Sequence, residues 1–198
     1  MPSVGLTGGI GAGKSTALAA LERLGAAVLS TDAVVHELYE RDPRLREAVV
    51  GRFGSEVAPA GVVDRGAVAE RAFANPNDRG WLEQLLWPLV GARVAAWLQE
   101  VRARGRSRAG PRAAVVEVPL LFESGMGDSY DATIAVVAEE RVRRERAARR
   151  AHVLVDERAA RQLSQRQKAQ RATFVVRNDG SEEDLARELS AVLDKLSG

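Results

Sequence analysis

The chain has 198 residues, a formal net charge of +2 and no cysteine. This length fits one domain of ordinary size, with room for inserted subdomains. The lack of cysteine excludes a disulfide framework, a thiolate nucleophile and a zinc site of the cysteine type. No apolar run approaches the ~20 residues of a membrane span, and the N-terminus shows no signal-peptide pattern, so we expect a cytoplasmic protein without a membrane partner.

Arginine supplies nearly all of the basic side chains, because lysine occurs only at Lys14, Lys168 and Lys195. A guanidinium binds planar oxyanions through two donors, so the bias is compatible with a phosphate ligand. Genomic base composition is the simpler explanation for most of these arginines. The two histidines, His36 and His152, are too few and too far apart to predict a histidine-based metal site.

Apolar, β-branched runs alternate with helical stretches along the chain. The runs cover residues 4–7, 27–31, 113–118, 132–137 and 172–176. Strands separated by helical patterns predict βαβ units around a parallel sheet, and therefore an α/β fold. The first helix is expected over residues 14–24, with Gly25 as its C-terminal stop.

A long insertion separates the second and third predicted strands. Pro88 should kink or break its main helix near Trp87. Residues 104–111, rich in Gly, Arg and Ser, are expected to form an exposed linker into the third strand. The helix itself is predicted by apolar residues at helical spacing, namely Leu82, Leu85, Leu86, Leu89, Val90, Val94, Trp97, Leu98 and Val101.

Two further helical stretches follow in the second half of the chain. An arginine-rich segment over about residues 139–171 is expected to be helical. The last helix should begin near Ser181, with Asp184 in a capping-box-like position three residues on.

The strongest signal is the run GGIGAGKS at residues 8–15, which satisfies the pattern G-x-x-x-x-G-K-[ST]. Glycines let the backbone turn tightly and aim successive N–H groups at phosphate oxygens, and the following helix adds the positive end of its dipole. Lys14 is expected to reach the β- and γ-phosphates of ATP, and the Ser15 hydroxyl to ligate Mg²⁺. The predicted ATP-binding residues of this P-loop are Gly8, Gly11, Ala12, Gly13, Lys14, Ser15 and Thr16, the last near the α-phosphate.

Two carboxylates are expected at the same edge of the sheet. Glu117 lies within an apolar strand, where an acid is costly unless it is paired or coordinates through water, so it is a candidate to support the magnesium shell. Asp32 directly follows the second strand, and open parallel sheets bind ligands outside the carboxyl ends of their strands. The alternatives are structural: Asp32 as a helix N-cap before Ala33, and Glu117 as a hydrogen-bond partner of the P-loop region.

Three stretches resemble the dephospho-CoA kinase family. Residues 5–16 (GLTGGIGAGKST) are similar to the opening of those enzymes, and residues 30–33 (STDA) fall where the family usually has Asp-Ala-Asp. Residues 118–125 (VPLLFESG) are the most family-specific stretch, because a P-loop alone fits many families. Further matches, in the expected order, are Arg146, Arg150, Arg161, Gln165 and residues 178–181 (NDGS).

The resemblance implies phosphorylation of the ribose 3′-hydroxyl of dephospho-CoA by ATP, the last step of coenzyme A synthesis. It implies a P-loop NTPase core over residues 1–33 and 109–198, in which a parallel β-sheet is flanked by helices. It also implies a helical CoA-side insertion over residues 34–108 and a helical lid over about residues 139–166. The oligomeric state is left open.

The resemblance also implies roles for individual residues. Asp32 matches the first aspartate of the family's motif and is the expected base that accepts the 3′-hydroxyl proton. Lys14 is expected to neutralise the β- and γ-phosphates together with Mg²⁺. Arg146 and Arg150 lie four residues apart, so on a helix they share a face and are expected to close over the triphosphate. The loop around Asn178 is expected to lie near the adenine.

This chain departs from the family pattern at two places. Val34 stands where the second aspartate of the Asp-Ala-Asp motif is usual, so any role of that carboxylate is absent. Trp87-Pro88 stands where the family usually has His-Pro, so a histidine contact to the substrate does not carry over. For Trp87, core packing is favoured over stacking on a ligand.

Other functions are open to such a chain. Another small-molecule P-loop kinase is the nearest alternative, and residues 119–125 argue against it. A GTPase is disfavoured because Arg177-Asn178-Asp179 lacks the lysine of the guanine motif. Residues 139–171 carry ten Arg and one Lys against four Glu and one Asp, which suits a nucleic-acid-binding module. The same segment has no Phe, Tyr or Trp to stack on bases, so no nucleic-acid partner is expected.

Overall fold

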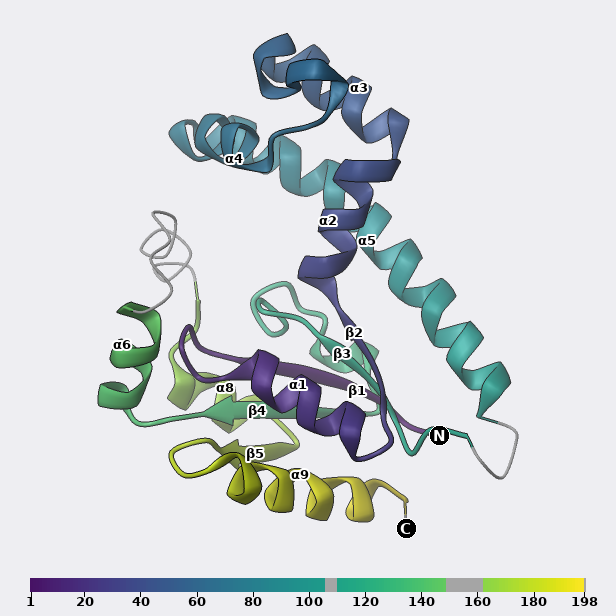
Figure 1. The fold of residues 1–198 in the computed structure, drawn as a ribbon, viewed down its shortest axis with the longest axis vertical. Coiled ribbons are helices and arrows are strands. Elements are labelled where there is room, and N and C mark those ends of the chain that lie inside the picture. Colours follow the sequence, from purple (N-terminus) through teal and green to yellow (C-terminus); the bar gives the residue numbers. More distant parts are fainter. Residues whose placement is uncertain (106–109, 149–161, 198) are drawn as a thin grey trace. The chain divides into compact units, whose positions relative to one another are not determined.

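The computed structural model describes residues 1–105, 110–148 and 162–197 (Figure 1). The chain forms two compact units, one from Met1–Ser30 with Leu98–Gly198 and the other from Thr31–Trp97. Each unit has its own cluster of buried apolar side chains. Among the described residues, no helix combines the length and the apolarity needed to cross a bilayer.

The first unit is built on a five-stranded parallel sheet in the order β2-β3-β1-β4-β5. The predicted α/β class is therefore confirmed, and so are all five predicted strands. The inner strands β3, β1 and β4 are apolar because they are buried on both faces, as is usual for parallel strands, whereas the edge strands β2 and β5 are only partly buried. The strands are β1 (Ser3–Gly8), β2 (Ala27–Ser30), β3 (Ala114–Glu117), β4 (Ala132–Val137) and β5 (Phe174–Arg177).

Alternation along β1 divides its side chains between the two faces of the sheet. Val4 and Leu6 belong to the main core, together with residues of α1 (Lys14–Arg23) and α9 (Glu182–Ser197). Gly5 lies against the side chains of Leu121 and Tyr130, so the opposite face is covered by the chain that follows β3. The absence of a side chain at Gly5 allows this close packing, because a Cβ there would lie 2.9 Å from Leu121.

Helix α1 begins and ends close to its predicted positions, and α9 begins close to its predicted start. α1 ends at Arg23, and Gly25 follows in the left-handed conformation with φ 89°, which stops the helix as expected. α9 is preceded by the predicted capping arrangement: the Asp184 amide donates to Ser181 Oγ at 3.2 Å, and the Ser181 amide donates to Asp184 Oδ2 at 3.0 Å.

The arginine-rich segment is not one continuous helix, which corrects the prediction for residues 139–171. It contains α6 (Glu140–Ala148) and α8 (Gln165–Arg171), and residues 162–164 are not helical. Ser164 and Gln167 form a capping box, in which each side chain bonds the other residue's backbone amide. This arrangement favours a new helix start at residue 165. Part of the predicted lid, residues 149–161, lies outside the described residues.

The second unit is helical and lies between β2 and β3 in the chain. Its helices are α2 (Thr31–Arg41), α3 (Pro43–Phe53), α4 (Arg65–Ala74) and the first part of α5 (Pro76–Arg104), with short 3₁₀ turns η1 (Ser55–Val57) and η2 (Pro59–Gly61). A third 3₁₀ turn, η3 (Gly127–Ser129), belongs to the first unit. Asp42 and Asp64 cap α3 and α4 by accepting hydrogen bonds from the first amides of each helix.

The predicted break at Pro88 is wrong, because α5 is continuous through it. Proline removes one hydrogen-bond donor, but apolar residues on both sides of Pro88 pack against the core of this unit and keep the segment helical. They are Trp81, Leu82, Leu85, Leu86 and Leu89. Trp87 does not join them: it is 55% exposed, so the interpretation of Trp87 as a core residue is also wrong.

Candidate active site

The glycine-rich loop follows β1, the central strand of the sheet, which has β3 on one side and β4 on the other. β1 connects through α1 to β2 at one edge of the sheet, whereas its neighbour β4 connects to β5 at the other edge, so the loop lies at a topological switch point, the usual ligand site of such sheets. Gly11 and Gly13 have φ values of 75° and 91°. This left-handed region favours glycine and lets the loop turn its amides inward.

Close approach of the backbone also requires glycine in this loop. A Cβ at Gly8 would lie 2.5 Å from the carbonyl oxygen of Val136, in the neighbouring strand β4. A Cβ at Gly13 would overlap the side-chain nitrogen of Asn178. The sequence pattern therefore reflects both conformation and packing.

Lys14, Ser15 and Thr16 begin α1 at the mouth of the loop. The Lys14 ammonium donates to the carbonyl oxygens of Gly8 at 3.1 Å and Gly9 at 3.3 Å, so it lies over the loop. Ser15 is exposed and Thr16 half-buried. The positive end of the α1 dipole adds to the charge of Lys14, and together they favour an anion at this position.

A pocket of about 280 Å³ opens beside the loop. It brings the P-loop, α6 and the loop after β5 together, and it includes five of the residues predicted from the sequence. Its lining residues are Gly11, Gly13, Thr16, Arg146, Asn178, Gly180 and Glu182.

Asn178 holds the P-loop from the side. Its side chain is buried, and its Nδ2 donates to the carbonyl oxygen of Ala12 at 2.9 Å. Its backbone amide donates to the carbonyl oxygen of Val137 at 2.8 Å, which continues the pairing of β5 with β4. The Asn178 carboxamide thus stabilises the loop conformation through a contact that the sequence did not predict. The expected position of this loop near the adenine stays a prediction.

Two arginines of α6 contact the loop region. Arg146 donates to the carbonyl oxygen of Asn178 at 3.0 Å, and Arg143 donates to the carbonyl oxygen of Ile10 at 3.0 Å. Sequence reasoning missed Arg143, although its spacing of three residues from Arg146 puts both on one helix face. Arg150 lies outside the described residues, so its predicted role is not tested.

The two predicted carboxylates occupy different units. Glu117 is the last residue of β3, is buried, and pairs in register with Leu6 of β1 and Ser30 of β2. Asp32 is exposed in the first turn of α2. Because α2 already includes Thr31, Asp32 lies inside the helix and not at the N-cap position that was the structural alternative. Its position relative to the P-loop stays a prediction.

The site offers the oxygen donors that Mg²⁺ prefers. Ser15 exposes a hydroxyl at the first turn of α1, and Glu117 places a carboxylate at the carboxyl end of the adjacent strand. Within the described ranges there is no group of three or more His, Cys, Asp or Glu side chains suited to a metal. A P-loop site fits that pattern, because Mg²⁺ there takes few protein ligands besides substrate phosphates and water.

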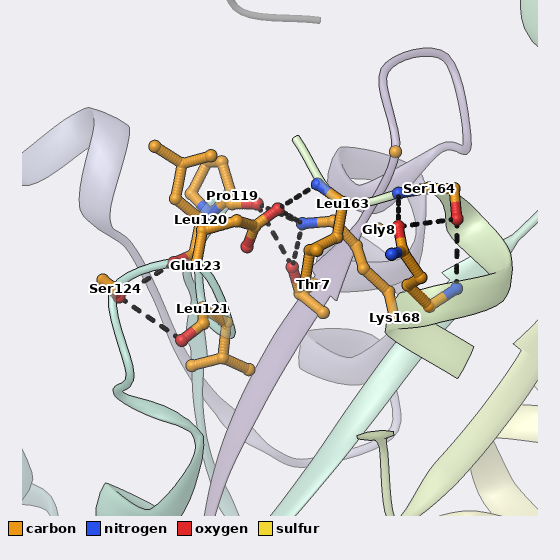
Figure 2. Close-up of polar contacts among 12 residues, drawn as sticks. Thr7, Gly8, Pro119, Leu120, Leu121, Glu123, Ser124, Leu163, Ser164 and Lys168 are labelled. Carbon is orange, nitrogen blue, oxygen red and sulfur yellow. Dashed lines mark hydrogen bonds and ion pairs between the residues drawn. The ribbon is translucent and has the colours of Figure 1, made fainter. Parts of the chain in front are cut away.

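A buried ion pair that sequence reasoning missed lies beneath the loop (Figure 2). Lys168 of α8 is fully buried, and its Nζ lies 2.9 Å from Glu123 Oε1. Burial lowers the pKa of the Lys168 ammonium from its ordinary value, and the hydrogen bond and charge of Glu123 oppose this shift. Two signals pointed to the pair: lysine is rare in this arginine-rich chain, and Glu123 belongs to the family-specific stretch 118–125.

The fold and the loop together define a class. A parallel sheet carries the pattern G-x-x-x-x-G-K-[ST] between its central strand and the first helix, with cations of α1 and α6 beside it. The protein is therefore a nucleotide-binding P-loop protein whose site suits phosphoryl transfer.

Comparison with known proteins identifies the family. The family model described as dephospho-CoA kinase matches residues 2–184. A relative from Anaeromyxobacter dehalogenans, named dephospho-CoA kinase, is 39% identical over 202 residues and is matched over 100% of this chain and 93% of its own length. The chain belongs to the dephospho-CoA kinase family and is a kinase.

Two solved structures share the fold of this chain. A crystal structure from Thermus thermophilus is 35% identical, has a TM-score of 0.76, and is matched over 100% of this chain and 99% of that one. The dephospho-CoA kinase from Campylobacter jejuni is 24% identical, with a TM-score of 0.71 and coverage of 98% and 96%. Because its identity is only 24%, the second structure supports the fold and not the function.

Proposed function

We propose that this kinase transfers the γ-phosphoryl group of ATP to the ribose 3′-hydroxyl of dephospho-CoA, giving coenzyme A and ADP in the last step of coenzyme A synthesis. The observation that carries the proposal is the family match over residues 2–184 together with an intact P-loop. In this reaction the bond between the γ-phosphorus and the 3′-oxygen forms, and the bond between that phosphorus and the β,γ-bridging oxygen breaks. The proton of the hydroxyl must leave to a base.

The P-loop is proposed to hold the β- and γ-phosphates. Backbone amides of the loop and of the start of α1 would donate to the anion, and Lys14 adds a full positive charge. Lys14 donates to the Gly8 and Gly9 carbonyl oxygens, which keeps its ammonium at the loop and supports a role in binding phosphate. Phosphoryl transfer depends mainly on such positioning and on charge stabilisation.

Ser15 and Glu117 are the residues proposed to hold Mg²⁺, Ser15 through its hydroxyl and Glu117 through its carboxylate or a water. When bound, Mg²⁺ supplies positive charge to the β- and γ-phosphate oxygens. Glu117 is kept at the carboxyl end of β3 by its pairing with two neighbouring strands. A position on a strand that is paired on both sides suits a carboxylate that must stay at a fixed distance from a metal ion.

Arg146 and Arg150 are proposed to stabilise the charge that develops on the transferring phosphoryl group, and Asn178 to place its loop beside the adenine. Arg146 lines the pocket next to Gly13 and Thr16, which supports its role. The role of Arg150 rests on its spacing from Arg146 and on the family resemblance at that position.

Asp32 is the proposed base that accepts the 3′-hydroxyl proton. It follows β2, whose carboxyl end lies next to that of β3, and it is exposed in the first turn of α2. The second unit, which begins at Thr31, is proposed to bind the CoA side of the substrate, and residues 139–166 to act as a lid. We further propose a cytoplasmic location and no nucleic-acid partner.

Identification of the product tests this proposal. The purified chain is incubated with ATP, Mg²⁺ and dephospho-CoA, and the product is analysed by mass spectrometry and by ³¹P NMR, which distinguishes a 3′-phosphate from phosphorylation elsewhere. The expected product is coenzyme A, formed only when ATP is present and lost on chelation of Mg²⁺. Phosphorylation at another position, or none, contradicts the proposal.

A further inference from the structure

The buried pair of Lys168 and Glu123 joins three separate segments of the chain at the base of the P-loop (Figure 2). Besides Glu123 at 2.9 Å, the Lys168 ammonium donates to the carbonyl oxygen of Pro119 at 2.7 Å and to Thr7 Oγ1 at 3.3 Å. Glu123 Oε1 also accepts the backbone amide of Leu163 at 2.8 Å. An ammonium has three donors, and here all three are used.

One of the joined segments is the start of the P-loop. Thr7 is the residue directly before Gly8, and its hydroxyl donates to the carbonyl oxygen of Pro119 at 3.3 Å while it accepts from Lys168. Because β1 alternates, Thr7 points to the sheet face away from α1 and α9. The ion pair therefore fixes the loop's first residues from the side opposite the main core.

The segment that carries Lys168 is also bonded to the residues just before α6, the helix of Arg143 and Arg146. Gln165, one turn before Lys168 on α8, bonds Ala138 in both directions: the Ala138 amide donates to Gln165 Oε1 at 2.9 Å, and Gln165 Nε2 donates to the Ala138 carbonyl oxygen at 2.8 Å. Ala138 lies two residues before the start of α6, which carries Arg143 and Arg146. A shift of α8 would therefore also move the start of α6, and with it Arg143 and Arg146.

Stability alone is a poor explanation for such a pair. Lys168 is 0% exposed, and one oxygen of Glu123 is buried without a hydrogen-bond partner among the residues that the structure describes. Two charges taken out of water are costly, and well-packed apolar residues in their place are often as stable or more so. What an ion pair supplies, and apolar packing does not, is a fixed direction for each bond.

We propose that the Lys168–Glu123 pair is a positioning pair, which holds the P-loop and the arginines of α6 in the relative arrangement needed for phosphoryl transfer. The inference rests on the proposed function. It assigns no contact with substrate to either residue, since both act through Thr7, Pro119 and α8.

Three variants test the pair, with one matched control. Lys168→Met removes the ammonium and keeps an unbranched side chain. Glu123→Gln keeps the shape and an acceptor for Leu163. The double variant removes both charges, and Lys195→Met is the control, because Lys195 is an exposed lysine of α9. Unfolding midpoints in urea are measured beside kcat and KM, at a temperature where every variant is folded.

A positioning role separates activity from stability. Lys168→Met leaves an unpaired buried carboxylate and should lower both the midpoint and kcat. The double variant should regain most of the midpoint, because no charge is left unpaired. Its kcat should stay about 10- to 100-fold below wild type, with KM for dephospho-CoA changed by less than about threefold, since small misplacements of reacting groups cost this much. Glu123→Gln should show a smaller loss of kcat.

Two results overturn the proposal. If kcat of the folded single variants equals that of Lys195→Met, or if kcat returns with the midpoint in the double variant, the pair serves stability only. Should Lys168→Met not fold, Glu123→Gln and the double variant decide the question in the same way. Wild type and Lys195→Met must both make coenzyme A; their failure to do so refutes the proposed function and not the pair.

Discussion

Replacement of Asn178 by alanine is the sharpest test of how the P-loop is held. The substitution removes the donor at 2.9 Å from the Ala12 carbonyl oxygen, and Ala12 itself is 0% exposed. A hydrogen bond contributes about 1 kcal/mol net, and a buried group left without a partner costs about 1–3 kcal/mol. We expect the free energy of unfolding to fall by about 1–3 kcal/mol.

The affinity of Asn178→Ala for ADP should also fall, because the hydrogen bond from Asn178 to Ala12 stabilises the loop conformation that binds phosphate. If about 1.4 kcal/mol of the loss falls on the loop, affinity for ADP drops about tenfold. Calorimetric titration with ADP and with pyrophosphate separates two roles of Asn178. Weaker binding of both ligands by the same factor indicates that Asn178 holds the loop, whereas weaker binding of ADP alone indicates contact with the adenosine part.

Asn77→Ala is the matched control, since Asn77 is exposed in the first turn of α5. A surface substitution of this kind should change the free energy of unfolding by no more than about 0.5 kcal/mol. If Asn178→Ala resembles this control in both unfolding and ligand affinity, the contact with Ala12 does not hold the P-loop and the reasoning fails.

Three other substitutions test separate parts of the account. Asp32→Asn should lower kcat by about 10²- to 10⁴-fold with near-normal ADP affinity, because a general base contributes that much to rate; a kcat within about threefold of wild type would move the base elsewhere. Arg146→Ala should reduce kcat far more than it raises KM for dephospho-CoA, since charge-assisted contacts matter most in the transition state, and an unchanged kcat would leave Arg146 a structural residue. Asp131→Asn tests the pH dependence of stability, measured by urea unfolding. Hydrogen bonds from the Ser3 amide and hydroxyl lower the pKa of the Asp131 carboxyl below its ordinary value of 3.8. The carboxylate therefore contributes fully to the free energy of unfolding above pH 3.8, and this contribution is lost as the pH falls through the lowered pKa. The difference in free energy of unfolding between wild type and Asp131→Asn should therefore become smaller in acid. A difference that grows in acid would contradict the stabilising role of the Ser3–Asp131 hydrogen bonds.

Local signals in the sequence were enough to predict the five strands of the sheet and the glycine-rich loop that follows the first of them. Each strand is a short apolar run, and the P-loop residues follow β1 directly, so both depend only on neighbours in the chain. Glu117 was singled out for a similar reason, because an acid inside an apolar strand is unusual, and its role in binding Mg²⁺ stays a prediction. Ser181 and Asp184 form a capping pair within three residues and were predicted correctly.

Long-range contacts explain what the sequence did not reveal. Lys168 meets Pro119 and Thr7 across 49 and 161 positions of the chain, and no local pattern connects them. Pro88 was expected to kink or break this helix; the break does not occur, because apolar neighbours pack on the core of the second unit and maintain the helix. Trp87 was expected inside that core, but it is exposed. The sequence does not reveal which face of α5 the rest of the second unit covers.

The central claim is that dephospho-CoA is the acceptor for this P-loop kinase, and a comparison of acceptors tests it most directly. ADP formation is followed in a coupled assay with ATP and Mg²⁺ and with dephospho-CoA, adenosine or shikimate as the acceptor at equal concentrations, and kcat/KM is determined for each. The account predicts that dephospho-CoA has the highest kcat/KM and that ADP formation matches coenzyme A formation one to one. Comparable or faster turnover of adenosine or shikimate would contradict it.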